Sequence, residues 1–261
     1  MLLAVDVGNT EIVVGLFEDP GGDKELVDHW RVSSDVARSS DELALLVRQL
    51  IGLRGLRLDG DIAGISLCSG VPRVTSALRA MADRYLGFAP VVVGPGTRTG
   101  VPVRYENPRE VGADRIANAV GALERFQPPL VVVDFGTATT LDAISSAGEY
   151  LGGAIVPGIE IGLDALYDRA ALLRRVELVE PRQAIGRSTE QAIQAGTLYG
   201  NAALVDGLVG RMETELGTAT VVATGGLAAL VAPYCARVDH LHPWLTLHGL
   251  RAVFERNLPG N

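Results

Sequence analysis

The sequence is poor in cysteine, in positive charge and in long apolar runs. Its two cysteines, Cys68 and Cys235, stand far apart and outside any C-x-x-C pair, which is typical of free thiols in a reducing compartment. Lys and Arg number 23 against 31 Asp and Glu, giving a formal net charge of −8. This balance argues against nucleic acid and against an anionic membrane as the main partner. No apolar run approaches the ~20 residues that a membrane span needs, so we expect a cytoplasmic protein.

Two nucleotide-binding motifs and a complete metal site are also missing. The sequence has no G-x-x-x-x-G-K-[ST], which excludes a P-loop enzyme. The segment GPGTRTG, 94–100, resembles a dinucleotide-binding loop, but its third Gly comes one place late and VPVRYENP follows instead of a helix. HLHP, 240–243, offers two His residues with no third ligand nearby, so we expect surface His residues there.

What the sequence does contain is one pattern that occurs twice. The segments LLAVDVGNTEIVVGLF, 2–17, and VVVDFGTATTLDAI, 131–144, both begin as apolar runs that end in an Asp. Each then reaches Gly and a hydroxyl residue and returns to apolar residues. Both predict two strands around a tight turn, and the first run, with no basic region before it, indicates a strand and not a signal peptide. Because aromatic residues are only 5%, the cores must rest on Val, Leu, Ile and Ala.

The elements around the two turns also repeat in order. In the first half we expect strands at 2–7, 11–17, 25–33, 61–69 and 89–94, and helices at 39–53 and 72–87. In the second half we expect strands at 130–136, 139–144, 148–158 and 218–226, and helices at 159–173, 187–214, 227–235 and 245–258. A helix at 112–126 lies near the border. The sequence therefore predicts an α/β protein of two duplicated βββαβα domains, 1–117 and 118–261, with a cleft between them.

The repeated turn suits the binding of phosphate. A hairpin tip with Gly and Ser or Thr exposes backbone N–H groups that can hold phosphate oxygens. The preceding Asp, Asp6 in one copy and Asp134 in the other, can hold a metal ion or its water beside them. Two such hairpins would form the two jaws of a nucleotide site. Two ordinary hairpins, whose Asp residues merely shape the turns, are the alternative.

Asp114, in the run GADR, is the candidate for a catalytic carboxylate. The preceding Gly-Ala pair allows a ligand to approach the backbone, and a helix is expected to begin here, where its N-terminus favours an anion. Phosphoryl transfer often uses a carboxylate to accept the proton of the attacking hydroxyl. A helix-capping Asp is the structural alternative, and a structural ion pair is the alternative for Arg115.

Four motifs in order carry a family resemblance. They are D-x-G-N-T at 6–10, E-V-G-A-D-R at 110–115, D-F-G-T-A-T-T at 134–140 and G-G-A-I-V-P-G at 152–158. The chain resembles the superfamily of acetate and sugar kinases, actin and the heat-shock ATPases, and within it the type III pantothenate kinases. The resemblance runs from residue 2 to about residue 258 and implies two ribonuclease H-like domains in the actin-like ATPase fold.

The resemblance implies ATP-dependent phosphorylation of pantothenate, the first step toward coenzyme A, by a homodimer that needs Mg²⁺ and a monovalent cation, potassium or ammonium. It implies that Asp114 is the base, that Asp134 binds the monovalent cation and that Asp6 faces the Mg²⁺-bound phosphates. Contacts with ATP are implied for Asp6, Val7, Gly8, Asn9, Thr10, Glu11, Ile12, Val13 and Thr137. Contacts with pantothenate are implied for Tyr105, Gly112, Ala113, Asp114, Arg115 and Thr189.

Several of these positions keep a structural alternative. Glu11 departs from the amide that the family commonly shows, and a carboxylate near phosphates is unfavourable unless it points away or meets the metal. Tyr105 could be a packed aromatic, and Thr189 a helix N-cap. Gly225 and Gly226 could support a nucleotide base or form a plain turn.

Two other functions compete with the kinase. A regulatory relative could keep the fold without catalysis, although the joint presence of Asp6, Asp114, Arg115 and Asp134 favours an enzyme. A kinase of the same fold could act on another small hydroxyl compound, because specificity rests on the shape of the pocket.

Overall fold

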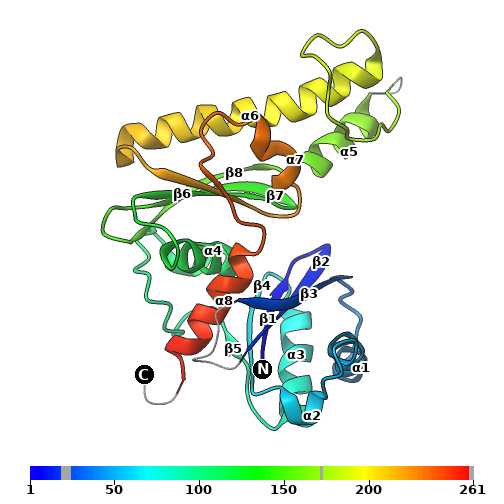
Figure 1. The fold of residues 1–261 in the computed structure, drawn as a ribbon, viewed down its shortest axis with the longest axis vertical. Coiled ribbons are helices and arrows are strands. Elements are labelled where there is room, and N and C mark those ends of the chain that lie inside the picture. Colours follow the sequence, from blue (N-terminus) through cyan, green and yellow to red (C-terminus); the bar gives the residue numbers. More distant parts are fainter. Residues whose placement is uncertain (19–24, 171–172, 259–261) are drawn as a thin grey trace. The chain divides into compact units, whose positions relative to one another are not determined.

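The computed structural model describes residues 1–18, 25–170 and 173–258 of the chain. It separates into two compact units (Figure 1), the first formed by Met1–Arg125 with Leu245–Asn261 and the second by Phe126–Trp244. The units therefore divide after Arg125, where the sequence suggested a border at 117/118, and the C-terminal helix belongs to the first unit. No helix in the described ranges is long and apolar enough to cross a membrane.

The first unit is built on a five-stranded sheet in the order β3-β2-β1-β4-β5. Its strands are β1 (Leu2–Val7), β2 (Glu11–Phe17), β3 (Leu26–Ser33), β4 (Gly64–Ser69) and β5 (Val91–Val92). The first three strands pair antiparallel, whereas β4 pairs parallel with both β1 and β5. The strand expected at 89–94 is thus shortened to two residues.

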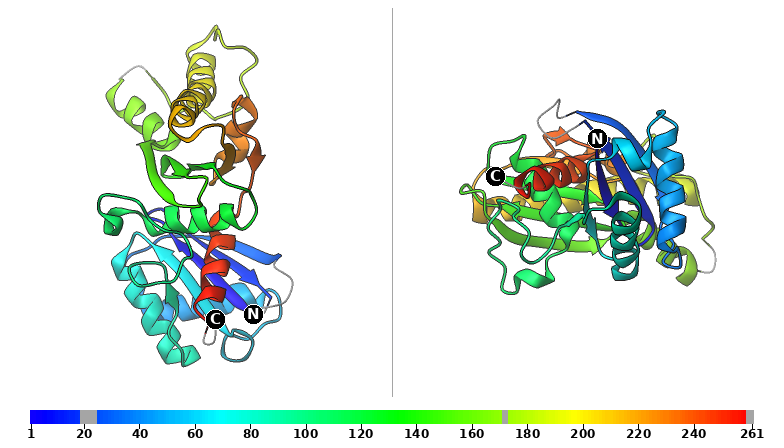
Figure 2. Two further views of the ribbon diagram at one scale, coloured as in Figure 1. Left: turned by 90° about the vertical axis from the view of Figure 1, so that its left-hand side faces the viewer. Right: turned by 90° about the horizontal axis from the view of Figure 1, so that it is seen from below.

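Helices cover both faces of this sheet. On one face α1 (Ser40–Gly52), the short α2 (Leu58–Asp61) and α3 (Pro72–Leu86) enclose a core of Val, Leu and Ile, as the low aromatic content predicted. A capping box between Ser39 and Glu42 begins α1, and Gly87, with φ 73°, ends α3. On the other face lie α8 (Leu245–Arg256) and α4 (Ala113–Leu123), as Figure 2 shows. A single 3-10 turn, η1 (Pro108–Glu110), precedes α4.

The second unit repeats the first strand for strand. Its sheet has the order β10-β9-β6-β7-β8, with β6–β7 and β7–β8 antiparallel and β9 parallel to both β6 and β10. The strands are β6 (Leu130–Phe135), β7 (Ala138–Ile144), β8 (Tyr150–Pro157), β9 (Thr220–Thr224) and β10 (His240–Leu241). The duplication read from the sequence is therefore confirmed in strand order and direction, except that β10 was not expected.

The helices of the second unit are α5 (Ile159–Arg169), α6 (Thr189–Leu216) and α7 (Ala228–Val231). The helix expected at 159–173 ends at Arg169, and residues 171–172 of that range lie outside the described part. The helix expected at 227–235 is split into α7 and a 3-10 turn, η2 (Ala232–Tyr234), where Pro233 lacks the N–H that an α-helix needs. Apolar side chains of β6 pack with α6 residues such as Leu198 and Val205 to form the core.

Candidate functional site

The first hairpin turn lies where the sequence predicted it. Asp6 is the second-last residue of β1 and pairs antiparallel with Val13 of β2. The turn is closed by a hydrogen bond from the Gly8 N–H to the Glu11 carbonyl, 2.9 Å, and a Cβ at Gly8 would lie 3.0 Å from that oxygen. Asn9 and Thr10 at the tip are exposed, so their backbone and side chains are open to a ligand.

Asp6 has a hydrogen-bond partner, Cys68, for which the sequence indicated only a free thiol. The Cys68 thiol donates to Oδ1 of Asp6 over 3.2 Å, because β4 runs parallel to β1 with Asp6 opposite Cys68. Burial raises the pKa of Asp6 to about 6, while the Cys68 hydrogen bond lowers it and the charge of Asp114 raises it. Burial and the charges of Asp6 and Asp114 also raise the pKa of the Cys68 thiol well above its ordinary value.

Asp114 belongs to the same site as Asp6, since its charge contributes, after burial, to raising the pKa of Asp6. As expected, a helix begins here: Asp114 is in the first turn of α4, and the N-cap is Gly112, so Asp114 is not the cap. A Cβ at Gly112 would lie 2.4 Å from Oδ1 of Asp114, which shows that the carboxylate folds back over Gly112. Arg115, beside it, is buried. The first unit thus gathers two carboxylates and a buried guanidinium-bearing side chain.

Glu11 is paired with a cation. Its Oε2 accepts a hydrogen bond from Nη1 of Arg31 on the neighbouring strand β3, 2.9 Å, and both side chains are partly exposed. Arg31 also lowers the pKa of Asp6. The carboxylate that departs from the family's amide therefore has its charge balanced locally, which the sequence alone did not reveal.

The turn of the second unit is one residue shorter than the first. Asp134 lies near the end of β6, the Gly136 N–H donates to the Ala138 carbonyl over 3.1 Å, and Thr137 at the tip is exposed. Asp134 pairs with Thr224 of β9 in the register in which Asp6 pairs with Cys68. The two units therefore place their Asp residues at equivalent positions, but the residue opposite is Cys68 in the first unit and Thr224 in the second.

Backbone surrounds the Asp134 carboxylate closely. Gly225 has φ 96°, and a Cβ there would lie 2.4 Å from Oδ1 of Asp134. A Cβ at Gly158 would lie 2.2 Å from the Thr137 carbonyl oxygen and 2.6 Å from that of Gly136. The Asp134 carboxylate thus lies against the backbone of Gly225, and the Gly136 and Thr137 carbonyls belong to the turn that follows it. Carboxylate and carbonyl oxygens are donors that suit a hard cation.

The remaining predicted residues are dispersed. Tyr105 is in a loop of the first unit and 36% exposed, so it is not a packed aromatic. Thr189 is the first residue of α6 and is exposed, whereas the N-cap is Ser188, whose side chain accepts from the Gln191 N–H. Gly226 follows β9 in the loop before α7.

Within residues 1–18, 25–170 and 173–258, no group of three or more His, Cys, Asp or Glu side chains could hold a metal ion. His240, in HLHP, is exposed and stacks on Phe126 with ring centroids 4.6 Å apart, as expected of a surface His. A divalent cation at Asp6 would therefore take its other ligands from water and from the phosphates of a substrate, as Mg²⁺ commonly does.

Comparison with known proteins gives a family for this arrangement. A family model described as type III pantothenate kinase matches residues 2–211. A type III pantothenate kinase of Moorella thermoacetica is 54% identical over 258 residues, covering 98% of this chain and 100% of that protein. One from Streptomyces griseus is 51% identical over 266 residues, covering 99% of each.

Solved structures resemble the chain at the level of the fold. A Baf family protein from Campylobacter jejuni superimposes with a TM-score of 0.58 at 18% identity, covering 98% of this chain and 97% of that one. A ROK family glucokinase from Streptomyces griseus, in complex with glucose and AMPPNP, gives a TM-score of 0.53 at 10% identity, covering 97% of each chain. Both support the actin-like ATPase fold that the sequence predicted.

Proposed function

Because the chain belongs to the type III pantothenate kinase family, we propose that it transfers the γ-phosphoryl group of ATP to the primary hydroxyl of pantothenate. The products are phosphopantothenate and ADP, and the reaction is the first step of coenzyme A biosynthesis. The observation that carries this proposal is the family match across nearly the whole chain. The proximity of the Asp6 and Asp114 carboxylates in the first unit supports it chemically.

Asp114 is the proposed general base. The hydroxyl of pantothenate attacks the γ-phosphorus, its proton passes to the Asp114 carboxylate, and the bond between the γ-phosphorus and the bridging oxygen of ADP breaks. The position of Asp114 in the first turn of α4 supports this role, because the helix N-terminus stabilises the ionised carboxylate that must accept the proton.

Asp6 and the turn that follows it are the proposed site for the phosphates of Mg²⁺-ATP. The exposed tip at Asn9 and Thr10 supports phosphate contacts. The half-buried Asp6 carboxylate, whose pKa its burial raises to about 6, is a donor that fits Mg²⁺, and the metal would supply neutralisation of phosphate charge. In the second unit we propose that Thr137 contacts ATP.

Pantothenate has a carboxylate that needs a cationic partner. We propose Arg115 for this role, with Gly112 and Ala113 providing close backbone approach and the exposed Tyr105 a further contact. Thr189, exposed at the start of α6, is proposed as a second hydroxyl contact.

Asp134 is the proposed ligand of a monovalent cation, potassium or ammonium. Its carboxylate lies against the backbone of Gly225, and the carbonyls of Gly136 and Thr137 are close by at Gly158. Carbonyl and carboxylate oxygens together can replace the hydration shell of such an ion.

A homodimer in the cytoplasm is also proposed. The second unit exposes large apolar side chains, among them Ile155 on the edge strand β8, 62% exposed, and Ile185, 80% exposed. Apolar surface of this kind is typical of a protein interface. Light scattering of the wild type and of Ile155→Asp would test the dimer, and a wild-type monomer would refute it. The free thiols of Cys68 and Cys235 are in keeping with a reducing compartment.

The test of the activity is phosphopantothenate formed from pantothenate and Mg²⁺-ATP, measured by mass spectrometry in potassium buffer and in sodium buffer. We expect product in potassium and a fall of about 10²-fold or more for Asp114→Asn. Asp41→Asn is the matched control, because Asp41 occupies the same second helical position in α1 as Asp114 does in α4. Folded wild-type protein that forms no product in either buffer would refute the proposed function.

A further inference from the structure

The C-terminal helix α8 is seated directly on the sheet that carries Asp6. A Cβ at Gly64 of β4 would lie 2.1 Å from Cζ of Phe254, and one at Gly15 of β2 would lie 2.8 Å from Cδ1 of Leu247. Only glycine at these two positions lets α8 approach the sheet so closely. These contacts therefore fix the distance between α8 and the strands that lead to the turn at Gly8–Thr10.

α4 is in turn packed against α8 through backbone. A Cβ at Gly249 of α8 would lie 1.8 Å from the carbonyl oxygen of Ala117, and one at Gly121 of α4 would lie 2.4 Å from that of Leu245. Figure 1 shows the two helices side by side. α8 thus packs on the sheet and also on α4, which carries Asp114.

A partly buried hydrogen bond joins the two helices one turn from Asp114. The Thr246 hydroxyl donates to Oδ1 of Asn118 over 2.7 Å, and Asn118 is fully buried. Residues four apart lie on the same face of a helix, so Asn118 and Asp114 share a face of α4. The bond therefore fixes the rotation of α4 about its own axis at the level of the catalytic carboxylate.

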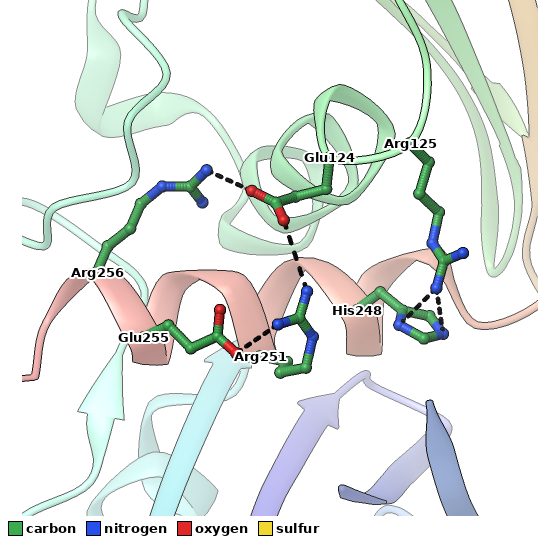
Figure 3. A network of polar contacts seen from close by, with 6 residues as sticks. All are labelled: Glu124, Arg125, His248, Arg251, Glu255 and Arg256. Carbon is green, nitrogen blue, oxygen red and sulfur yellow. Dashed lines mark hydrogen bonds and ion pairs between the residues drawn. The ribbon is translucent and has the colours of Figure 1, made fainter. Parts of the chain in front are cut away.

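Charged side chains join the same helices at the other end of α4 (Figure 3). Glu124, the C-cap of α4, binds Arg256 over 2.6 Å and Arg251 over 3.6 Å, and Arg251 also pairs with Glu255. The Arg251 side chain is only 6% exposed, so solvent screens the charges of this pairing less than it would at the surface. Nη2 of Arg125 lies 3.0 Å from Nδ1 of His248. These charged contacts hold the C-terminal end of α4, and the Thr246–Asn118 hydrogen bond holds it nearer its N-terminal end.

We propose that Thr246 is a positioning residue for the phosphoryl transfer. Through Asn118 it holds the first turns of α4, and with them Asp114, at the place where the carboxylate meets the attacking hydroxyl. This inference rests on the proposed function. It assigns a role in catalysis to the C-terminal helix, which is far in sequence from both Asp6 and Asp114.

The expected effect appears in turnover and not in binding. Thr246→Val keeps the shape and removes the hydroxyl, so we expect kcat to fall about tenfold while the KM values for ATP and pantothenate stay within about twofold. Thr246→Ser restores the hydroxyl and should restore most of kcat. Thr75→Val is the matched control, since its hydroxyl bonds a helix carbonyl, that of Val71, in α3 on the opposite face of the sheet.

A double-mutant cycle separates positioning from general damage. If Thr246 acts through Asp114, Thr246→Val should lower the residual rate of Asp114→Asn by much less than it lowers the wild-type rate. An equal loss in both backgrounds, or no loss in the wild-type background, would overturn the inference. Thr246→Ala takes the place of Thr246→Val in every comparison if the valine variant does not fold.

Hydrogen exchange gives a readout that does not depend on activity. Amides 117–120 donate to carbonyls in the first turn of α4, so a loosened first turn should exchange faster in Thr246→Val and return to the wild-type rate in Thr246→Ser. Unchanged exchange at 117–120 would overturn the inference. If the wild type forms no phosphopantothenate, the proposed function fails and the catalytic role of Thr246 fails with it, whereas faster exchange reversed by serine then shows only that Thr246 holds the first turn of α4.

Discussion

The Cys68 thiol donates a hydrogen bond to the Asp6 carboxylate, 3.2 Å from sulfur to Oδ1. A thiol is a weak donor, so it offsets only part of the effect of burial, and the pKa of Asp6 remains about 6. Near neutral pH the folded protein therefore holds a carboxylate that a cation would stabilise. Ionising Asp6 in the folded state therefore costs the first unit part of its stability, and the Mg²⁺ proposed at this site would offset that cost.

Comparing the stability of Asp6→Asn with that of the wild type, both without ligand, should reveal this cost. Folding raises the pKa of Asp6 from 3.8 to about 6, so its contribution to stability is fully present below the lower value. This contribution is lost as pH rises through the pKa of the folded state, about 6. Asparagine does not ionise, so relative to wild type Asp6→Asn should gain up to about 3 kcal/mol of unfolding free energy between about pH 4 and pH 8. Kinase activity should fall at least 10²-fold.

Urea unfolding at both pH values, in the presence of a chelator, measures the difference. Asp83→Asn, at an exposed position on α3, provides the baseline for loss of one negative charge. A stability difference between Asp6→Asn and wild type that does not change with pH would show that burial does not perturb this carboxylate.

Arg31 should protect ATP binding from the charge of Glu11. Removing the cation in Arg31→Gln leaves the Glu11 carboxylate unbalanced beside the phosphate turn, so KM for ATP should rise about two- to fivefold, the range expected of an exposed pair. The double variant Arg31→Gln with Glu11→Gln should bring KM back toward the wild-type value. A double variant as weak as the single one would mean that Arg31 acts on ATP directly.

Gly249→Ala should destabilise the first unit by about 1–3 kcal/mol or more, because its Cβ would lie 1.8 Å from the Ala117 carbonyl oxygen and force α4 and α8 apart. The control is Gly207→Ala in α6, where a Cβ meets no atom within 4 Å and alanine should stabilise the helix by up to about 1 kcal/mol. Denaturant unfolding compares the two. Equal effects would mean that α8 adjusts freely to the larger residue.

Gly225→Ala should weaken the response to potassium. Its Cβ would press on Oδ1 of Asp134, and φ 96° is unfavourable for alanine. Gly217→Ala is the control, because φ 80° strains its backbone in the same way but no atom lies within 4 Å of its Cβ. It therefore separates the effect of backbone strain from the effect of the contact with Asp134. We expect the potassium concentration for half-maximal activity to rise about tenfold or more in Gly225→Ala alone. Similar values in both variants would remove Asp134 from the cation site.

The sequence predicted the parts of the fold that depend on local patterns. Apolar runs ending at Asp6 and Asp134, each followed by Gly, were enough to place both hairpins and to suggest the duplication. Capping residues placed the helices to within a few residues, with Ser39 and Gly87 the clearest cases. The start of α4 at GADR was likewise visible, because Gly and Asp are typical of a helix N-terminus.

Contacts between residues far apart in the sequence could not be predicted from it. Nothing in LTLHGLRAVFERNL says that this helix returns to the first unit, because its apolar face would fit either sheet. Cys68 was read as an inert thiol, although its place at the end of a parallel strand could have suggested a neighbour for Asp6. The pairing of Glu11 with Arg31 needs the register of β2 and β3, which the sequence does not fix.

The return of α8 to the first unit has a consequence for how the protein is made. The second unit is one continuous stretch, Phe126–Trp244, whereas the first is completed only by residues after 244. During synthesis the N-terminal sheet must therefore wait, with the face that α8 will cover still open, while the entire second unit is translated and can fold. The segment that is made first is therefore the last to complete its tertiary structure.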